Sequence, residues 1–184
     1  IDQVLVLFGL PDRIFGQIYN SRKLGPNDFD DAFFGTFFYD SVPGSNIPLV
    51  VHLHGSPLSP VEPQLRYSVK GTKGSFVKYG IDPQEDQLKL DPPLSTSDSA
   101  FGVEAEQQAG VLTTVQSDGT FKSERITSEH GRYLSWYENV GEALQGGDPS
   151  KLYVKPEQAC EVIRMIELMY ESSQNGKVVQ VPKA

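Results

Sequence analysis

The sequence has almost no cysteine and no long apolar run. Its 184 residues include one cysteine, Cys160, so no disulfide can form within the chain, and a reducing compartment such as the cytoplasm is the simplest expectation. No uninterrupted apolar segment approaches the roughly 20 residues that a membrane-spanning helix needs. We therefore expect a chain that folds around its own core, and at this length it needs neither a metal nor a disulfide to do so.

Positive charge is also scarce. Sixteen Lys and Arg residues stand against 24 Asp and Glu residues, which gives a formal net charge of −8. Nucleic-acid binding and attraction to an anionic membrane both require concentrated positive charge. Because the sequence shows no basic cluster, we expect neither a nucleic acid nor a membrane as a partner.

Motifs for common cofactors and nucleophiles are missing as well. The sequence contains no G-x-G-x-x-G, no G-x-x-x-x-G-K-[ST] and no G-x-S-x-G, which mark dinucleotide sites, phosphate loops and serine hydrolases. The glycines of 71–74 join two expected strands without a following helix, so a tight turn is favoured over a phosphate site. Cys160 lies beside an apolar helical stripe, where packing is expected rather than nucleophilic chemistry.

The chain is rich, by contrast, in aromatic residues and alternating patterns. Its 10 Phe and 8 Tyr residues favour pleated sheet. Alternation and turn residues predict strands at 13–23, 33–39, 49–54, 65–70, 75–79, 111–115, 120–126 and 177–181. Apolar spacing and end signals predict helices over 2–8, 83–88 and 133–144, and a last helix from Pro156 to a stop at Gly176.

These elements predict an α+β fold in a single domain over residues 1–184. Short connections favour antiparallel pairing, so we expect an open, predominantly antiparallel sheet with helices packed on one face. The strand 33–39 is apolar on both sides, which predicts that the other face serves oligomerisation or contact with a neighbouring domain. Loops are expected at 24–31 and 42–46, and the polar residues 91–109 are expected to form an exposed insert.

Five side chains are candidates for a polar binding site. His52 and His54 share a strand face, but a metal there needs a third ligand and supporting groups, so solvated or hydrogen-bonded imidazoles are favoured. Lys78 and Tyr79 point to opposite sheet faces, and either can hold a hydroxyl or relay a proton; the simpler alternative is one solvated and one packed side chain. Tyr133 begins a helix, where the spacing favours a core position over a cleft.

One segment carries a specific resemblance. Residues 70–85, which read KGTKGSFVKYGIDPQE, closely resemble a segment of the Gfo/Idh/MocA oxidoreductases. Further matches to the same family follow in order along nearly the whole chain, at 1–3, 7–11, 131–133, 136–139, 162–167, 171–173 and 176. The resemblance is nearest to the subgroup that includes scyllo-inositol dehydrogenases and uncharacterised sugar dehydrogenases.

The resemblance covers only the second half of such proteins. In that family an N-terminal Rossmann domain binds NAD or NADP, and a C-terminal α+β domain shapes the substrate pocket and commonly forms the subunit interface with its open sheet. The family's catalytic Lys lies in the nucleotide domain, and its catalytic Asp and His lie upstream of the position that matches Asp2. The chain opens inside an apolar pattern at Ile1, so we expect a fragment without catalytic groups and without a bound cofactor.

The function that the resemblance implies is hydride transfer between a nicotinamide and a carbon of a sugar or polyol. This chain would supply the pocket wall and the homo-oligomer interface, with Lys78, Tyr79, His52, His54 and Tyr133 as candidate polyol contacts, and would be inactive alone. Two alternatives stay open. One is a non-enzymatic interaction or regulatory protein of the same fold, like the fungal galactose-pathway repressors that resemble the family. The other is a chain that acts alone as an oligomerising domain.

Overall fold

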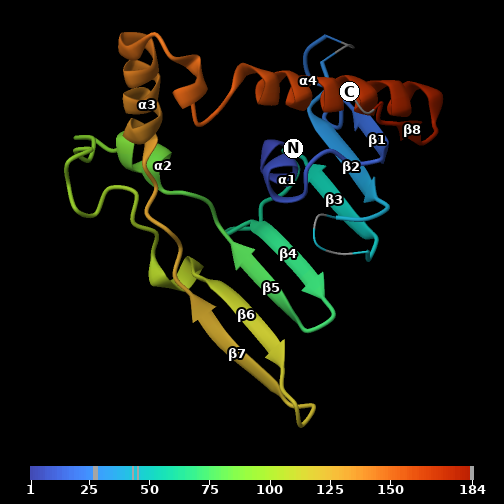
Figure 1. Cartoon of the computed structure of the whole chain (residues 1–184), viewed down its shortest axis with the longest axis horizontal. Helices are drawn as coiled ribbons and strands as arrows, with labels where there is room; N and C mark the ends of the chain where they lie inside the picture. The colour runs from blue at the N-terminus through green and yellow to red at the C-terminus, as the bar shows by residue number, and fades with distance from the viewer. Residues whose placement is uncertain (27–28, 43, 45, 183–184) are drawn as a thin grey trace. The chain divides into compact units, whose positions relative to one another are not determined.

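The computed structural model describes residues 1–26, 29–42, 44 and 46–182 and divides into two compact units (Figure 1). Unit 1 comprises Ile1–Ser59 and Val154–Ala184, and unit 2 comprises Pro60–Tyr153. Within the described residues, each unit holds one four-stranded sheet. The expected loop at 24–31 and turn at 42–46 include positions 27–28, 43 and 45, which lie outside the described residues.

Unit 1 is a sheet with two helices packed on one face. Its strands are β1 (Arg13–Tyr19), β2 (Ala32–Tyr39), β3 (Leu49–Gly55) and β8 (Val179–Gln180), in the order β3-β2-β1-β8 with antiparallel pairing throughout. Its helices are α1 (Asp2–Phe8) and α4 (Pro156–Asn175). Figure 1 shows α4 as the long helix that lies beside the strands of this sheet.

The core of unit 1 lies between this sheet and its helices. Ile14 of β1, Phe37 of β2 and Met165 of α4 are each 0% exposed, and residues of α1 pack against the same cluster. Phe8 meets Tyr39 edge-on, with ring centroids 6.1 Å apart. These contacts place the alternate residues 33, 35, 37 and 39 of β2 on the helix side, because side chains alternate along a strand.

A pair of glycines lets α4 approach the strands closely. Gly16 of β1 is directly opposite Gly35 of β2, and Met169 of α4 lies over both. The hydroxyl of Ser172, also on α4, accepts a hydrogen bond of 2.9 Å from the Gly16 N–H and donates one of 2.6 Å to the Lys177 carbonyl. The helix is therefore held to the strand by polar contacts as well as by apolar packing.

Tyr39 ends β2 at the edge of the core. Its hydroxyl donates to the Gly9 carbonyl at 3.1 Å, and its side chain is 2% exposed. Burial raises the pKa of the Tyr39 phenol to about 12, and the nearby Asp12 carboxylate acts in the same direction. The ring is therefore neutral throughout the physiological range, and its hydroxyl keeps its proton to donate.

The opposite face of the unit 1 sheet carries no helix among the described residues of that unit. We call it the open face, and it comprises the alternate positions of β1, β2 and β3, which are Arg13, Phe15, Gln17, Tyr19, Ala32, Phe34, Thr36, Phe38, Val50, His52 and His54. None of these residues is acidic, although the chain as a whole is strongly acidic, and at the edge of the face Arg13 pairs with the Asp40 carboxylate at 2.9 Å.

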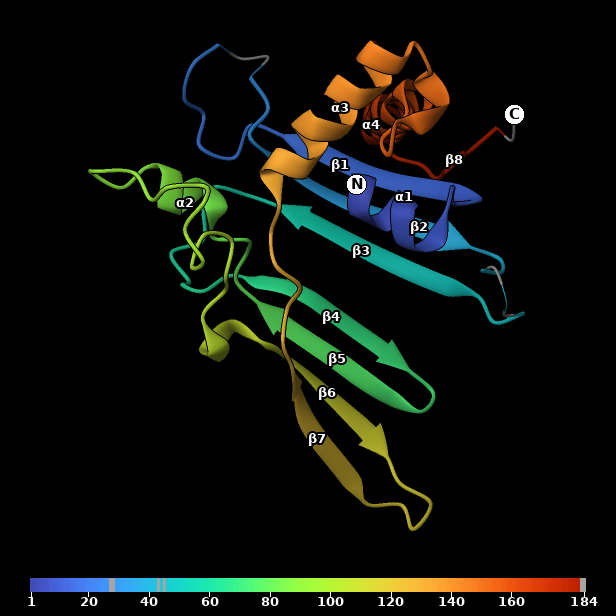
Figure 2. The same ribbon diagram turned by 60° about the vertical axis from the view of Figure 1, so that its left-hand side comes forward.

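Unit 2 contains a second antiparallel sheet and two further α-helices. Its strands are β4 (Leu65–Gly71), β5 (Gly74–Tyr79), β6 (Gly110–Val115) and β7 (Phe121–Ile126), and they pair in chain order (Figure 2). The helices are α2 (Gln84–Leu88) and α3 (Tyr133–Gly146), and two short 3-10 helices span Glu106–Gln108 and Pro149–Lys151.

A single glutamine fixes the start of α3. The Gln84 side chain is 1% exposed; its Nε2 donates to Asp82 Oδ1 at 2.9 Å and Oδ2 at 3.0 Å, and its Oε1 accepts from the Tyr133 N–H at 2.8 Å. Gly131 leaves room for these groups, since a Cβ there would lie 2.0 Å from Asp82 Oδ2. The segment that resembles the oxidoreductase family thus has a structural role in this unit.

The predicted fold class is confirmed. The chain is α+β with antiparallel pairing throughout, and every predicted strand and helix is present within a few residues of its expected limits. The strands form two sheets rather than the one that was expected. No helix in the described part of the chain has both the length and the apolar character needed to cross a bilayer.

Two packing expectations are wrong. Tyr133 was favoured as a core residue of α3, yet it is 45% exposed, and Tyr137 and Leu144 of the same stripe are 65% and 76% exposed. Cys160 was expected to pack, and it is exposed. Helical spacing shows which residues share a face, but it does not show whether another element lies against that face.

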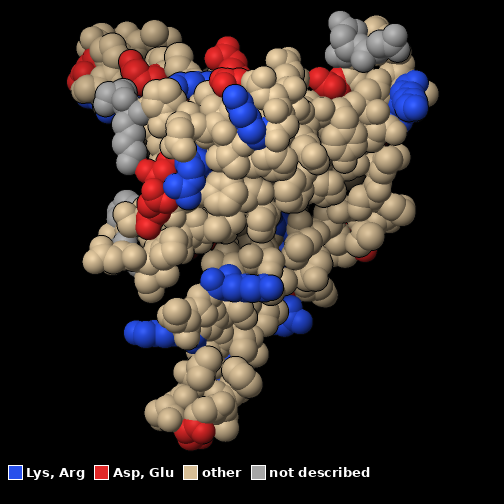
Figure 3. All heavy atoms as spheres, turned by 90° about the vertical axis from the view of Figure 1, so that its right-hand side faces the viewer, with Lys and Arg blue, Asp and Glu red and all other residues tan. Residues whose placement is uncertain are grey.

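Charged side chains do not form one large patch of a single sign on the face shown in Figure 3. The surface shown is mostly uncharged, with acidic and basic side chains near one another on its upper part and several Lys and Arg side chains on its lower part. This distribution agrees with the lack of a basic cluster in the sequence.

Candidate functional site

The five predicted site residues are divided between the two units. His52 and His54 lie on β3 in unit 1, whereas Lys78 and Tyr79 lie on β5 and Tyr133 begins α3 in unit 2. The structure therefore supports two separate groups, and each is described within its own unit.

The two histidines share the open face of unit 1. Both are exposed, and they lie opposite Thr36 and Phe34 of β2. The Nδ1 atom of His52 is 3.2 Å from the Thr36 hydroxyl, and its ring stacks on Phe34 at a centroid distance of 5.9 Å. Among the described residues, no group of three or more His, Cys, Asp or Glu side chains is placed to hold a metal.

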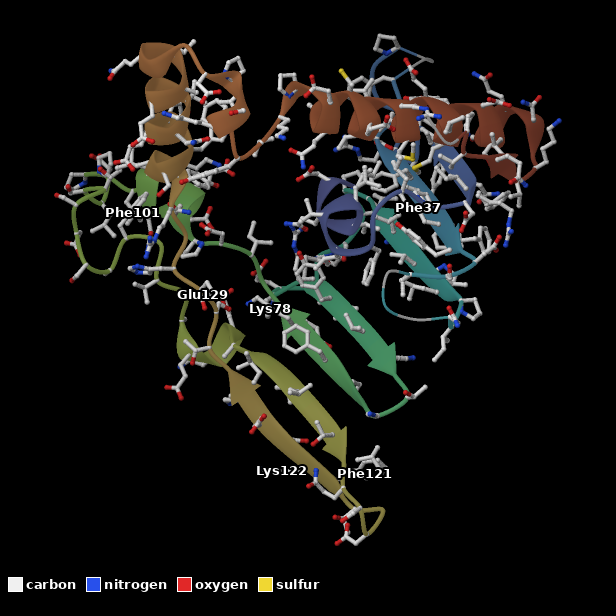
Figure 4. The ribbon with its side chains drawn as sticks, in the orientation of Figure 1. Phe37, Lys78, Phe101, Phe121, Lys122 and Glu129 are labelled. Atoms are coloured by element: carbon white, nitrogen blue, oxygen red, sulfur yellow. The ribbon has the colours of Figure 1, made fainter. Side chains whose placement is uncertain are left out.

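Lys78 belongs to a buried polar cluster in unit 2. Its ammonium donates to both carboxylate oxygens of Glu104 at 2.6 Å and to the Gln108 carbonyl at 2.9 Å. The Lys78 and Glu104 side chains are only 15% and 8% exposed. Ser128 completes the cluster, since its hydroxyl donates to Glu104 Oε2 at 2.5 Å. Figure 4 shows Lys78 at the end of β5 where the connecting loops converge.

A hollow of about 120 Å³ lies beside this cluster. Its polar walls come from Glu104, Glu106, Thr127, Ser128 and His130, and small residues of 102–109 form the rest. Lys78 does not line it. A lysine ammonium has three hydrogens to donate, and all three are engaged. The residues of this cluster that line the hollow are Glu104 and Ser128.

The other two candidates of unit 2 are at the surface. Tyr79 is 46% exposed and pairs with Leu65 on the sheet face opposite Lys78, as the strand geometry predicts. Tyr133 is fixed through its backbone N–H by Gln84, and its ring is partly exposed. Neither side chain lines the hollow at Glu104.

Sequence reasoning missed Glu104, Ser128 and His130. Glu104 is 26 positions from Lys78 and 24 from Ser128, so no local spacing connects them. The residues 91–109 were expected to be an exposed insert, but this segment includes Phe101, which is 6% exposed, as well as the buried Glu104 carboxylate. Its polar composition gave no signal that part of it would turn inward.

Unit 1 has a larger hollow of about 290 Å³ that contains none of the predicted residues. Its lining is mainly apolar, with Asp30, Asp31 and Tyr170 as polar members. The hydrogen bond from Arg22 lowers the pKa of Asp31 to about 2. The Tyr170 hydroxyl donates to Asp30 Oδ2 at 3.1 Å, and burial together with this contact raises its pKa. Asp31 is therefore engaged by Arg22, and Tyr170 is engaged with Asp30.

The described residues do not fit a dinucleotide. A Rossmann-type site needs a parallel strand that leads through a glycine-rich turn into a helix whose N-terminus meets the pyrophosphate. Every pair of neighbouring strands within the described residues is antiparallel, and the turn at 71–74 leads from β4 into β5. A nicotinamide cofactor has no such cradle in this part of the chain.

Comparison with known proteins gives consistent matches. Residues 1–181 match the family model described as "Oxidoreductase family, C-terminal alpha/beta domain". The chain is 33% identical over 182 residues to an uncharacterized oxidoreductase, C26H5.09c, of Schizosaccharomyces pombe, covering 96% of this chain and 48% of that protein. It is 32% identical over 181 residues to scyllo-inositol 2-dehydrogenase (NADP(+)) IolW of Bacillus subtilis, covering 98% of this chain and 46% of that one.

Solved structures show the same relationship. The Bacillus subtilis protein yvaA superposes with a TM-score of 0.83 at 31% identity, covering 98% of this chain and 49% of that one. An oxidoreductase from Bacillus cereus superposes with a TM-score of 0.77 at 26% identity, covering 99% of this chain and 49% of that one. The chain thus spans about half the length of the proteins it matches.

Proposed function

This chain belongs to the Gfo/Idh/MocA oxidoreductase family as its C-terminal alpha/beta domain, and on that premise we propose that it forms the substrate-side wall of an NAD(P)-dependent enzyme that acts on a sugar or polyol. The observation that carries the proposal is the match over residues 1–181, together with relatives that are about twice as long. IolW, named as an inositol dehydrogenase that uses NADP(+), supports the substrate class and the cofactor class.

In this proposal the nicotinamide supplies the hydride chemistry from the half of the protein that lies outside this chain. The residues of this chain bind and orient the hydroxylated substrate, which needs several well-placed hydrogen bonds. Tyr79 and Tyr133, whose side chains are exposed in unit 2, are the proposed substrate contacts. His52 and His54 lie on the open face of unit 1, and we assign them to the surface proposed below for a second copy of the chain. Lys78, whose donors are all engaged, contributes through Glu104.

The test compares the longer protein with the 184-residue chain. We expect the longer protein to oxidise sugars or polyols with NAD or NADP, followed by nicotinamide absorbance. We expect the chain alone to show no turnover and no binding of NADH or NADPH in calorimetric titration. Micromolar binding of either dinucleotide by the chain alone, or no turnover of any hydroxylated substrate by the longer protein, would contradict the proposal. The regulatory alternative is not favoured, because the relatives named above are oxidoreductases.

We further propose that a second copy of the chain covers the open face of unit 1. Phe15, Phe34 and Phe38 give this face an apolar centre, and the Asp40 carboxylate at its edge is paired with Arg13, which limits the repulsion between two acidic chains. A closed dimer with both copies using the same surface is the commonest arrangement.

Light scattering over a dilution series tests this arrangement. We expect twice the 20.3 kDa chain mass for the unmodified protein, and the monomer mass for Phe34→Glu, because a buried unpaired carboxylate opposes association. Phe121→Glu is the control, since Phe121 is 75% exposed at the tip of the β6–β7 hairpin in unit 2 (Figure 4). A monomeric unmodified protein, or equal behaviour of the two variants, counts against the proposal.

A further inference from the structure

We propose that Glu104, Ser128 and His130 form a hydroxyl-binding subsite in unit 2 that holds one end of a neutral sugar or polyol. This inference rests on the proposed function, since it assigns a place to the substrate of that function. Lys78 is the positioning residue of the subsite, because it holds the Glu104 carboxylate without lining the hollow.

The Glu104 carboxylate retains the capacity to accept another hydrogen bond. Two ionised oxygens offer about four acceptor positions, and the bonds from Lys78 and Ser128 account for three. Glu104 is also one of the residues that line the hollow. A hydroxyl placed in the hollow can therefore donate to Glu104, and a bond to a charged acceptor of this kind is stronger than a neutral one.

The charge of the subsite selects the class of ligand. Lys78 neutralises Glu104, so the buried pair has no net charge to attract an ion. Glu106 adds a second carboxylate at the wall of the hollow, and a phosphate or carboxylate on the ligand would meet it as a like charge. The arrangement fits an uncharged hydroxylated molecule and disfavours a sugar phosphate.

The size of the hollow limits the ligand. A volume of about 120 Å³ corresponds to roughly ten water positions by the usual measure of one water per 10–15 Å³. Gly102, Ala105 and Ala109 leave this space open, and Val103 supplies an apolar wall for the carbon side of the ligand. The subsite fits one end of a polyol better than an oligosaccharide.

The subsite is preorganised by bonds between three distant segments. The Gln87 side chain accepts from the Gly102 N–H at 2.7 Å and donates to the Ala100 carbonyl at 3.0 Å. The Gly131 N–H donates to the Gly102 carbonyl at 3.0 Å. These contacts fix the segments that carry Glu104 and His130, and a fixed site loses less entropy when it binds a ligand.

The test is a titration of the isotopically labelled 184-residue chain with sorbitol, followed by the backbone amide resonances. We expect saturable shifts confined to residues 102–109 and 127–130, and a Kd in the millimolar range. Ser128→Ala should raise this Kd at least fivefold while leaving the melting temperature within a few degrees. Glu104→Gln should raise it further, and Glu85→Gln is the control, since Glu85 is 61% exposed in its pair with Lys89.

Three results would overturn the subsite. These are no shifts at about 100 mM sorbitol, an unchanged Kd for Ser128→Ala, or tighter binding of glucose 6-phosphate than of glucose. A kinetic assay of the longer protein gives a second test. There, Ser128→Ala should raise KM for the polyol about fivefold with kcat retained. If the Ser128→Ala variant turns over the polyol with unchanged KM, the subsite is refuted and the proposed function stands, whereas absence of turnover in the unmodified longer protein would refute the proposed function itself.

Discussion

Replacing Lys78 with methionine is expected to lower the free energy of unfolding by about 3–5 kcal/mol, the cost of leaving a buried charge without its partner. The Glu104 carboxylate is 8% exposed and receives two of its hydrogen bonds from Lys78. Methionine keeps the length of the side chain but cannot donate. Urea denaturation followed by circular dichroism measures the loss.

Two matched variants separate the lost ion pair from general disturbance. Lys89→Met breaks the exposed pair between Lys89 and Glu85, whose side chains are 68% and 61% exposed, and should leave the free energy of unfolding nearly unchanged, because solvent screens such a pair. Combining Lys78→Met with Glu104→Leu removes both charges and should recover much of the loss. A Lys78→Met effect below about 1 kcal/mol would falsify the description of this cluster as a buried, mutually dependent pair.

Replacing Gly16 with alanine is expected to lower the free energy of unfolding by about 3 kcal/mol, which is at the upper end of the loss that overpacking of a core usually causes. A Cβ at this position would lie 2.8 Å from the Met169 carbonyl oxygen and 2.9 Å from Met169 Cα. These are helix backbone atoms, so α4 as a whole must move away from β1. That movement also weakens the bond between the Gly16 N–H and Ser172.

Two other glycines serve as controls in the same denaturation experiment. Gly35→Ala brings a Cβ to 2.9 Å from the terminal Cε of Met169, and because this flexible end can rotate aside, a smaller loss is expected. Gly141→Ala in α3 has open space around it and should stabilise the helix by about 0.5–1 kcal/mol. If Gly16→Ala and Gly35→Ala lower the free energy of unfolding by the same amount, the close approach of α4 to β1 is not what makes glycine necessary at position 16.

Local sequence signals predicted the secondary structure of this chain well. The stop of α4 at Gly176, whose φ is 62°, and the Asp118-Gly119 turn between β6 and β7 follow from short-range chemistry that each residue carries by itself. The division of the strands into two sheets depends on which strands pair over long range, and no local pattern specifies that choice.

The candidate site was predictable only in part. Lys78 was singled out as a candidate substrate contact, which stays a prediction, and the alternation that separates it from Tyr79 was correctly predicted from the strand. Its partner Glu104 is joined to it only through the fold, and burial of an ion pair depends on packing that residue spacing does not encode. The sequence therefore indicated the lysine, while the glutamate that lines the hollow required the structure.

The hydrogen bonds of the Gln84 side chain to Asp82 and to the Tyr133 N–H have a consequence for mutational studies of this family. Substitution of Gln84 or Gly131 would displace the start of α3. A mutational screen that measures only enzyme activity would then count the substituted residue as one that takes part in the reaction. Abundance and solubility measured alongside turnover would instead show that such alleles impair folding, so that Gln84 would count as a structural residue and not as one that contacts the substrate.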